Sequence, residues 1–215
     1  MSNENILTTI SEKLQAGQAS ELQNQVQQAL DQGVEAEDIL NNGLMHGMSI
    51  IGEKFKNNDV YVPEVLIAAR AMNSATEILQ SALDEAGVEP KGTVCLATVK
   101  GDLHDIGKNL VSMMLEGAGY SVVDLGVNVE TEAMIKAVQE NNASILGLSA
   151  LLTTTMPLMG EIVTNLEEAD IRDDVKVIIG GAPVTQNYAD KIGADGYASD
   201  AATAVTITNQ LLGYA

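Results

Sequence analysis

From Ile6 to Leu83 the apolar side chains recur at the three- and four-residue spacing of amphipathic helices, with polar residues between them. Four helices with short connections are predicted, which indicates a helical bundle. Their apolar positions are Ile6, Ile10 and Leu14 for the first; Leu22, Val26 and Leu30 for the second; Leu40, Leu44, Met48, Ile51 and Phe55 for the third; and Val65, Met72, Leu79 and Leu83 for the fourth.

Two breaks divide this pattern. The run 57–59, Asn-Asn-Asp, ends the third helix, and Pro63 stands where a fourth helix accepts a proline in its first turn. Residues 86–92, Ala-Gly-Val-Glu-Pro-Lys-Gly, then interrupt both helical and strand periodicity. We therefore predict a linker there and two domains, 1–88 and 89–215.

After Gly92 apolar, β-branched runs alternate with helical segments. Strands are predicted at 93–99, 121–125, 144–149, 175–179 and, from a weaker pattern, 196–198. Such alternation is typical of a parallel sheet covered by helices on both faces. The predicted fold class is α/β with an N-terminal all-α domain: a four-helix-bundle cap, then a Rossmann-like (flavodoxin-like) doubly wound sheet of five parallel strands.

Charge and composition limit the partners. The 215 residues, 46% of them hydrophobic, suffice for one large or two small cores. Thirty acidic against eleven basic residues give a formal charge of −19, which would repel nucleic acid and anionic lipid. No apolar run reaches the ~18 to 20 residues of a membrane span, and the N-terminus lacks the pattern of a signal peptide, so we expect a cytoplasmic protein. The single cysteine, Cys95, is expected to be buried in a strand and to pack against apolar neighbours.

The most informative segment follows the first predicted strand. Residues 101–109 read Gly-Asp-Leu-His-Asp-Ile-Gly-Lys-Asn and contain Asp102, His104 and Gly107. Loops at the carboxyl ends of parallel strands are where open α/β folds present their chemistry. A carboxylate two residues before an imidazole suits an oriented metal ligand.

Two nucleotide-binding interpretations fail. The run 117–119, Gly-Ala-Gly, has no third glycine at the spacing of a dinucleotide fingerprint and is better explained as the end of a helix. Gly107-Lys108 is followed by Asn109 instead of Ser or Thr, and Asp102 stands where a phosphate loop has its first glycine.

A conventional metal site lacks ligands as well. Only His46 and His104 are present, so a zinc site or the multi-histidine site of a metal-dependent phosphohydrolase is short of donors. A metal held by a macrocycle needs a single axial donor from the protein.

At this point the chain resembles the cobalamin-binding, or corrinoid, proteins. Their pattern is Asp-x-His-x-x-Gly, then Ser-x-Leu, then Gly-Gly, which occurs here in order at 102–107, 149–151 and 180–181. Each part follows a predicted strand of the same sheet. Upstream, 48–55, 61–66 and 69–72 are similar to the helical cap of methionine synthase and of small corrinoid proteins.

The resemblance implies a role for each of these residues. His104 would be the lower axial ligand of cobalt, replacing the cofactor's own nucleotide base. Asp102 would accept a hydrogen bond from the other ring nitrogen, and Ser149 would extend this relay toward solvent. The implied cofactor contacts are Asp105, Gly107, Ser149, Leu151, Gly180 and Gly181, the glycines and Leu151 lying along the displaced nucleotide tail. Asp105 also fits an acidic residue at a helix N-terminus.

The resemblance also implies the function: a methyl carrier, not catalytic alone, that is the corrinoid subunit of a multi-component methyltransferase. Cobalamin would alternate between Co(I) and methylcobalamin. A substrate:corrinoid methyltransferase would deliver the methyl group, and a second methyltransferase acting on tetrahydrofolate or a thiol would remove it. A reductive activase would recover oxidised cobalt. The donor (methanol, a methylamine, a betaine or an aryl methyl ether) would be chosen by the partner enzyme.

Other cobalamin proteins are weighed against this expectation. Radical isomerases carry their substrate on a barrel domain for which this chain has no room, and they lack the helical cap. Cobalamin-dependent transcriptional sensors usually add a basic DNA-binding region, which residues 1–88 do not show. A sensor or a cobalamin storage protein remains the alternative.

Overall fold

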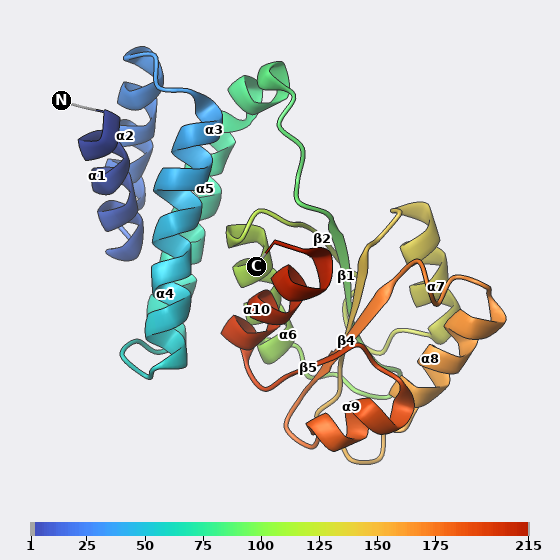
Figure 1. The fold of residues 1–215 in the computed structure, drawn as a ribbon. Coiled ribbons are helices and arrows are strands. Elements are labelled where there is room, and N and C mark those ends of the chain that lie inside the picture. Colours follow the sequence, from blue (N-terminus) through green and yellow to red (C-terminus); the bar gives the residue numbers. More distant parts are fainter. Residues whose placement is uncertain (1–2, 215) are drawn as a thin grey trace. The chain divides into compact units, whose positions relative to one another are not determined.

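The structure, a computed structural model, describes residues 3–214. The chain divides into two compact units, and the change from one to the other follows Pro90. The first unit is helical, and the second is a five-stranded sheet with helices (Figure 1). This change of architecture lies close to the predicted boundary of 88/89. The division into two independently folding domains at 88/89 stays a prediction.

The predicted helices of the first unit are present. Three are regular: α1 (Asn3–Gln15), α2 (Ala19–Asp31) and α5 (Val62–Ala86). The third predicted helix is composite, because α3 (Ala36–Asp38), the π-helical segment η1 (Ile39–Met45) and α4 (His46–Lys56) follow one another without a break. The wider winding of η1 changes which side chains face inward, so Ile39 is fully buried where the α-helical spacing predicted Leu40.

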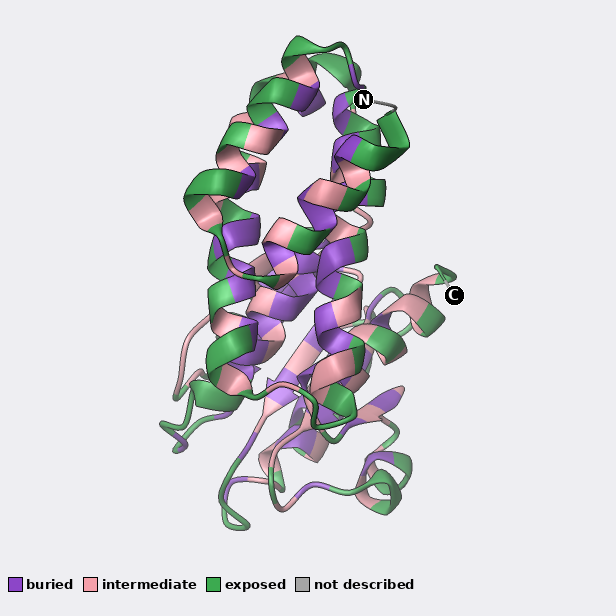
Figure 2. Ribbon diagram, turned by 90° about the vertical axis from the view of Figure 1, so that its left-hand side faces the viewer, coloured by how far each residue is buried: buried purple, intermediate pink, exposed green. Residues whose placement is uncertain are grey.

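Buried residues recur along the helices of this unit, and exposed residues alternate with them on the outer sides (Figure 2). Ile6, Ile10 and Leu14 of α1 are almost fully buried, as the periodicity predicts. They pack with the inner positions of the other helices, which include Leu22, Val26, Leu44, Ile51, Val65, Met72 and Leu79. Burial of these apolar side chains is the main driving force for this unit.

Two glycines bring the composite helix close to α1. A Cβ on Gly43 would lie 2.9 Å from Cγ2 of Ile10, and a Cβ on Gly47 would lie 3.0 Å from the backbone oxygen of Ser11. The second contact is with backbone, which cannot rotate away as a side chain can. Gly47 is therefore required by helix packing.

The ends of α5 follow from local sequence. Tyr61 is its N-cap, Pro63 lies in its first turn as predicted, and a carboxylate oxygen of Glu64 accepts a hydrogen bond from Tyr61 N at 3.1 Å. The helix ends at Gly87, whose φ of +67° is the left-handed conformation that glycine adopts without strain. Gly87 lies within the predicted linker, 86–92.

The second unit contains the predicted doubly wound sheet. Its strands are β1 (Thr93–Thr98), β2 (Ser121–Asp124), β3 (Ile145–Ser149), β4 (Lys176–Gly180) and β5 (Gly196–Ala198). All pair in parallel in the order β2-β1-β3-β4-β5. This order confirms the flavodoxin-like arrangement and places its topological switch point between β1 and β3.

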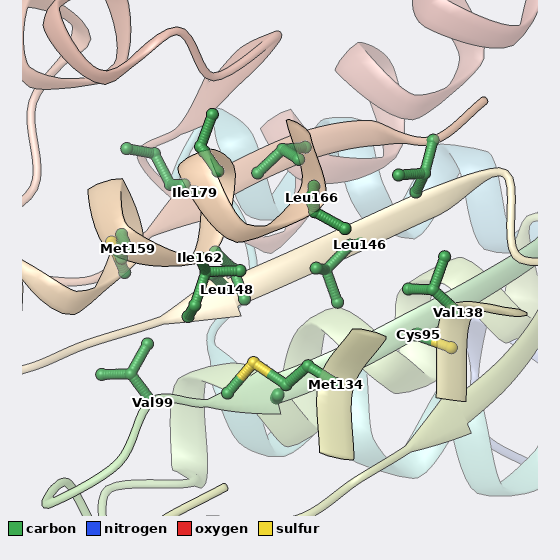
Figure 3. Close-up of a cluster of buried hydrophobic side chains, with 14 of the residues drawn as sticks. Cys95, Val99, Met134, Val138, Leu146, Leu148, Met159, Ile162, Leu166 and Ile179 are labelled. Carbon is green, nitrogen blue, oxygen red and sulfur yellow. The ribbon is translucent and has the colours of Figure 1, made fainter. Parts of the chain in front are cut away.

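Helices cover both faces of this sheet (Figure 1). One face is covered by α6 (Ile106–Gly117) and α10 (Ala201–Leu212), and the other by α7 (Thr131–Glu140), α8 (Leu158–Glu168) and α9 (Gln186–Ile192). Figure 3 shows the core on the second face, where β1, β3 and β4 meet α7 and α8. Cys95 is fully buried in this core, and burial raises the pKa of its thiol to about 11. Cys95 therefore packs as an apolar residue.

Within residues 3–214, the helices are all too short or too polar to cross a membrane.

Candidate cobalamin site

The three predicted sequence patterns lie beside one another at the carboxyl edge of the sheet. In the strand register, Thr98 at the end of β1 pairs with Ser149 at the end of β3, and Ser149 pairs with Gly180 at the end of β4. The loops that follow these strands carry His104, Leu151 and Gly181. The switch point of a doubly wound sheet is where such folds bind ligands.

Asp102 and His104 form a direct contact. The Oδ1 atom of Asp102 lies 2.6 Å from Nδ1 of His104 and also accepts the backbone N–H of His104 at 3.1 Å. Because a carboxylate can only accept, Nδ1 carries the proton, so that the neutral form of this imidazole has its lone pair on Nε2. Asp102 and His104 are thus in contact, and the role of Asp102 in orienting a metal-bound imidazole stays a prediction.

The second oxygen of Asp102 is held from the loop after β3. Oδ2 accepts hydrogen bonds from Leu151 N at 2.8 Å, Leu152 N at 3.1 Å and Thr155 Oγ1 at 3.0 Å. The Asp102 side chain is fully buried, and burial alone would raise its pKa. The hydrogen bonds from His104, Leu151 and Thr155 outweigh burial and hold the pKa of Asp102 well below its usual range. Asp102 is thus a fixed carboxylate at neutral pH.

His104 is exposed, although the carboxylate that it contacts is buried. Its side chain is 51% exposed, and among the described residues Nε2 has no hydrogen-bonding partner. Four large apolar side chains are exposed with it: Leu103 (72%), Leu151 (41%) and Leu152 (40%) in the two loops, and Ile106 (78%) at the start of α6. An outward lone pair with exposed apolar side chains on the same loops suits an apolar ligand that contains a metal.

Thr98 fixes the backbone of the same loop. This threonine is fully buried at the end of β1, and its hydroxyl donates to the carbonyl oxygen of His104 at 2.9 Å. His104 is therefore held through its side chain by Asp102 and through its carbonyl by Thr98. Sequence reasoning missed Thr98 because a threonine in a β-branched strand looks like ordinary strand composition.

Ser149, predicted to continue the relay, makes no hydrogen bond with the side chain of Asp102 or His104 among the described residues. The hydroxyl that donates to the carboxylate is that of Thr155. The relay role of Ser149 stays a prediction. Thr155 was missed because it lies in a run of three threonines, 153–155, in which spacing alone does not single out one hydroxyl. Leu151 reaches the site through its backbone N–H, while its predicted contact with the nucleotide tail is untested.

The three predicted glycines, Gly107, Gly180 and Gly181, differ in how far the protein's own packing requires a glycine at that position. Gly181 has a φ of +126°, and a Cβ there would lie 1.9 Å from the carbonyl oxygen of Ala150, so the fold itself requires glycine. A Cβ on Gly180 would lie 3.0 Å from the carbonyl oxygen of Ala198. Gly107, in contrast, is helical. Apart from its chain neighbours and the backbone of its own helix, none of the described residues lies within 4 Å of where its Cβ would stand. Packing within the protein therefore does not explain a glycine at 107, and its contact with the cofactor stays a prediction.

Asp105 precedes α6, and Lys108 lies in the first turn of that helix. Asp105 is exposed immediately before α6, where its Oδ2 accepts a hydrogen bond from Nδ2 of Asn109 at 3.2 Å. This position fits an acidic residue at a helix N-terminus, and a contact of Asp105 with the cofactor stays a prediction. Lys108 is buried and bonds both carboxylate oxygens of Asp124, at 2.6 and 2.5 Å, so its ammonium is used inside the protein.

The donor set fits a macrocyclic metal cofactor. Between residues 3 and 214, no three histidine, cysteine, aspartate or glutamate side chains converge on a point where they could hold a metal ion. His104 offers one oriented nitrogen, Gly107 leaves open space in the first turn of α6, and the exposed leucine and isoleucine side chains offer apolar contacts. These are the features that a corrin, which supplies its own equatorial nitrogens, would need.

Comparison with known proteins indicates cobalamin binding for both the helical and the α/β part of the chain. Two family models, each described as a B12 binding domain, match residues 92–206 and 6–80. Dimethylamine corrinoid protein 1 of Methanosarcina mazei is 40% identical over 213 residues, which cover 98% of each chain. A corrinoid protein of Desulfitobacterium hafniense is 41% identical over 190 residues, 87% of this chain and 88% of the relative.

Solved structures agree with these matches. A cobalamin-binding protein from Desulfitobacterium hafniense has a TM-score of 0.81 at 31% identity, covering 95% of this chain and 98% of that one. A chain of the methanol:cobalamin methyltransferase complex MtaBC from Methanosarcina barkeri has a TM-score of 0.86 at 30% identity, covering 98% and 81%. The fold is therefore that of a cobalamin-binding protein. The chain belongs to the corrinoid proteins, and its cofactor is cobalamin.

Proposed function

We propose that this protein is a methyl carrier, which receives a methyl group from a substrate:corrinoid methyltransferase and yields it to a second methyltransferase acting on tetrahydrofolate or a thiol. The observation that carries the proposal is the pair at the switch point, where a buried carboxylate fixes an exposed imidazole at 2.6 Å. A carrier needs a firmly positioned protein ligand for its metal, and this pair would offer one.

The chain's own residues have the following proposed roles. His104 binds the cobalt of cobalamin through Nε2, while Asp102 keeps the proton on Nδ1 and fixes the plane of the ring. Thr155 and the N–H groups of Leu151 and Leu152 hold Asp102. Gly107, Gly180, Gly181, Leu151, Ser149 and Asp105 are proposed contacts of the cofactor. Cobalamin, when bound, supplies the cobalt that accepts and releases the methyl group.

The names of the relatives support the carrier role. They include corrinoid proteins for dimethylamine and trimethylamine, and the structural relative in MtaBC belongs to a methanol:cobalamin methyltransferase. We propose a donor of this kind, a methylamine or methanol, with betaines and aryl methyl ethers as further candidates. A reductive activase is proposed as the third partner and the cytoplasm as the place of action. A cobalamin sensor or storage protein is the alternative.

A methyl-transfer experiment tests the proposal against storage. The protein is loaded with hydroxocobalamin, reduced with titanium(III) citrate and treated with radiolabelled methyl iodide. A carrier takes up one label per cofactor and loses it when a corrinoid:thiol methyltransferase and thiol, or a corrinoid:tetrahydrofolate methyltransferase and tetrahydrofolate, are added. A protein that retains cobalamin but does not become labelled, or does not release the label to either enzyme, contradicts the carrier function and favours storage or sensing.

A further inference from the structure

We propose that Asn128 is a positioning residue for His104; the inference rests on the proposed role of His104 as the cobalt ligand. Asn128 lies between β2 and α7, and no pattern in the sequence marks it. It belongs to a segment that continues the pairing of β2 with β1 beyond the strand itself. Leu125 N donates to Leu96 O at 2.8 Å, Thr98 N to Gly126 O at 3.0 Å, and Val129 N to Thr98 O at 3.1 Å.

At the end of this pairing, Asn128 contacts the loop of the site at two points. Its side-chain Oδ1 accepts the backbone N–H of Gly101 at 2.7 Å, and its own backbone N–H donates to the carbonyl oxygen of Asp102 at 2.9 Å. The two hydrogen bonds grip the chain on both sides of the Gly101–Asp102 peptide. Asn128 therefore fixes the backbone from which the Asp102 side chain projects.

Movement at this point would reach the imidazole directly. Asp102 is the group that bonds Nδ1 of His104, and its Oδ2 has fixed donors in the loop after β3. If the turn that ends at Asp102 shifts, the carboxylate cannot keep both sets of partners. Residues that orient a metal-bound histidine without touching the metal typically change metal affinity about tenfold or more when removed.

The backbone of Asn128 makes a clean test possible. Its φ of +54° is in the left-handed region, which glycine, asparagine and aspartate tolerate. Asn128→Gly keeps this conformation and the backbone N–H but removes the Oδ1 acceptor. Asn128→Asp keeps an acceptor oxygen and serves as the rescue variant.

Asn142 is a matched control. It has nearly the same conformation, with a φ of +46°, in the exposed turn between α7 and β3 that precedes the amino end of that strand. Asn142→Gly makes the same chemical change in the same backbone region on a residue at the opposite end of β3 from the site. An effect of Asn128→Gly that Asn142→Gly lacks belongs to the loop contact.

The first measurement is electron paramagnetic resonance of the protein loaded with cobalamin in the Co(II) state. Labelling of histidine with ¹⁵N identifies nitrogen coupling from His104. The second measurement is a titration with hydroxocobalamin, which gives Kd. Asn128→Gly is expected to lose histidine coupling in part of the molecules and to raise Kd by about threefold to tenfold. Asn128→Asp and Asn142→Gly are expected to match the unsubstituted protein. In the cofactor-free protein, faster hydrogen exchange of the Gly101 amide in Asn128→Gly checks that the bond is lost.

Two results would overturn the inference alone: Asn128→Gly that keeps full histidine coupling and the original Kd, or Asn142→Gly that shows the same loss as Asn128→Gly. If the unsubstituted protein shows no coupling from His104, the inference falls together with the proposed ligand. The starting protein therefore separates failure of the positioning role from failure of the proposed function.

Discussion

Thr155 donates a hydrogen bond to the carboxylate oxygen of Asp102 that His104 does not use, with 3.0 Å between Oγ1 and Oδ2. The two residues are far apart in sequence and meet because β1 and β3 are neighbours in the sheet. Thr155 is itself buried. The pair thus connects the loop after β3 with the carboxylate that contacts His104, the proposed cobalt ligand.

Replacing Thr155 by valine keeps the shape of the side chain but removes this donor. We expect the free energy of unfolding of the cofactor-free protein to fall by about 1.5–3 kcal/mol, as for other hydrogen bonds to a charged group. Thr155→Ser should retain most of the stability. Ser149→Ala should change it by less than about 0.5 kcal/mol, because among the described residues the Ser149 hydroxyl has no bond to the pair. Urea unfolding measures all three; an effect of Ser149→Ala as large as that of Thr155→Val would return Ser149 to the relay.

Gly107→Ala is expected to separate stability from cofactor binding. Apart from its chain neighbours and the backbone of its own helix, no described residue lies within 4 Å of the added methyl group. The cofactor-free protein should therefore be unchanged or more stable by up to about 1 kcal/mol. If the space beside Gly107 belongs to the cofactor, hydroxocobalamin should bind more weakly. Thermal unfolding and a binding titration give the two quantities, and unchanged affinity would show that the cofactor does not use this space.

Gly47→Ala should have the opposite effect on stability. The added methyl group would lie 3.0 Å from the backbone oxygen and 3.1 Å from the Cα of Ser11, so α1 and α4 would have to separate. Overpacking of this kind costs about 1–3 kcal/mol. The measurement is urea unfolding, with Gly107→Ala as the helical glycine control. Equal stability of the two variants would contradict the close packing of these helices.

The pH dependence of stability is predicted at Asp200, the N-cap of α10. Burial would raise the pKa of this carboxyl, but hydrogen bonds from Thr203 and Ser199 outweigh burial and lower the pKa below its ordinary 3.8. The ionised group therefore stabilises the fold above pH 3.8, and this contribution is lost as pH falls through the lower, folded-state pKa.

Asp200→Asn keeps an N-capping side chain without the charge. We expect it to lower the free energy of unfolding by about 0.3–1 kcal/mol at pH 7, and the difference from the unsubstituted protein should shrink below pH 3.8. Urea titrations at several pH values measure this difference. A difference that stays constant down to about pH 2.5 would assign the effect of the substitution to geometry instead of charge.

The sequence predicted those parts of the fold whose signals are local. The strands end within one or two residues of their predicted limits because β-branched runs are bounded by glycine or polar residues, and Pro63 marked the start of α5. The winding of η1 was not predictable, since whether Ile39 or Leu40 faces inward depends on close contact with α1 and not on spacing.

The same distinction applies to the site. Asp102 and His104 are two residues apart, so their pairing was visible in the sequence. The contacts of Thr155 and Asn128 join loops that only the strand order brings together. Neither residue type is unusual in a loop, and a single sequence carries no signal that selects them.

The most direct test of the central claim is the visible absorption spectrum of the protein reconstituted with hydroxocobalamin, compared with His104→Ala and with His46→Ala. His46 is the second histidine of the chain and lies on the surface at the start of α4. We predict a base-off, histidine-ligated spectrum for the unsubstituted protein and for His46→Ala, and loss of histidine ligation in His104→Ala only. A spectrum of His104→Ala identical to that of the unsubstituted protein would contradict His104 as the cobalt ligand.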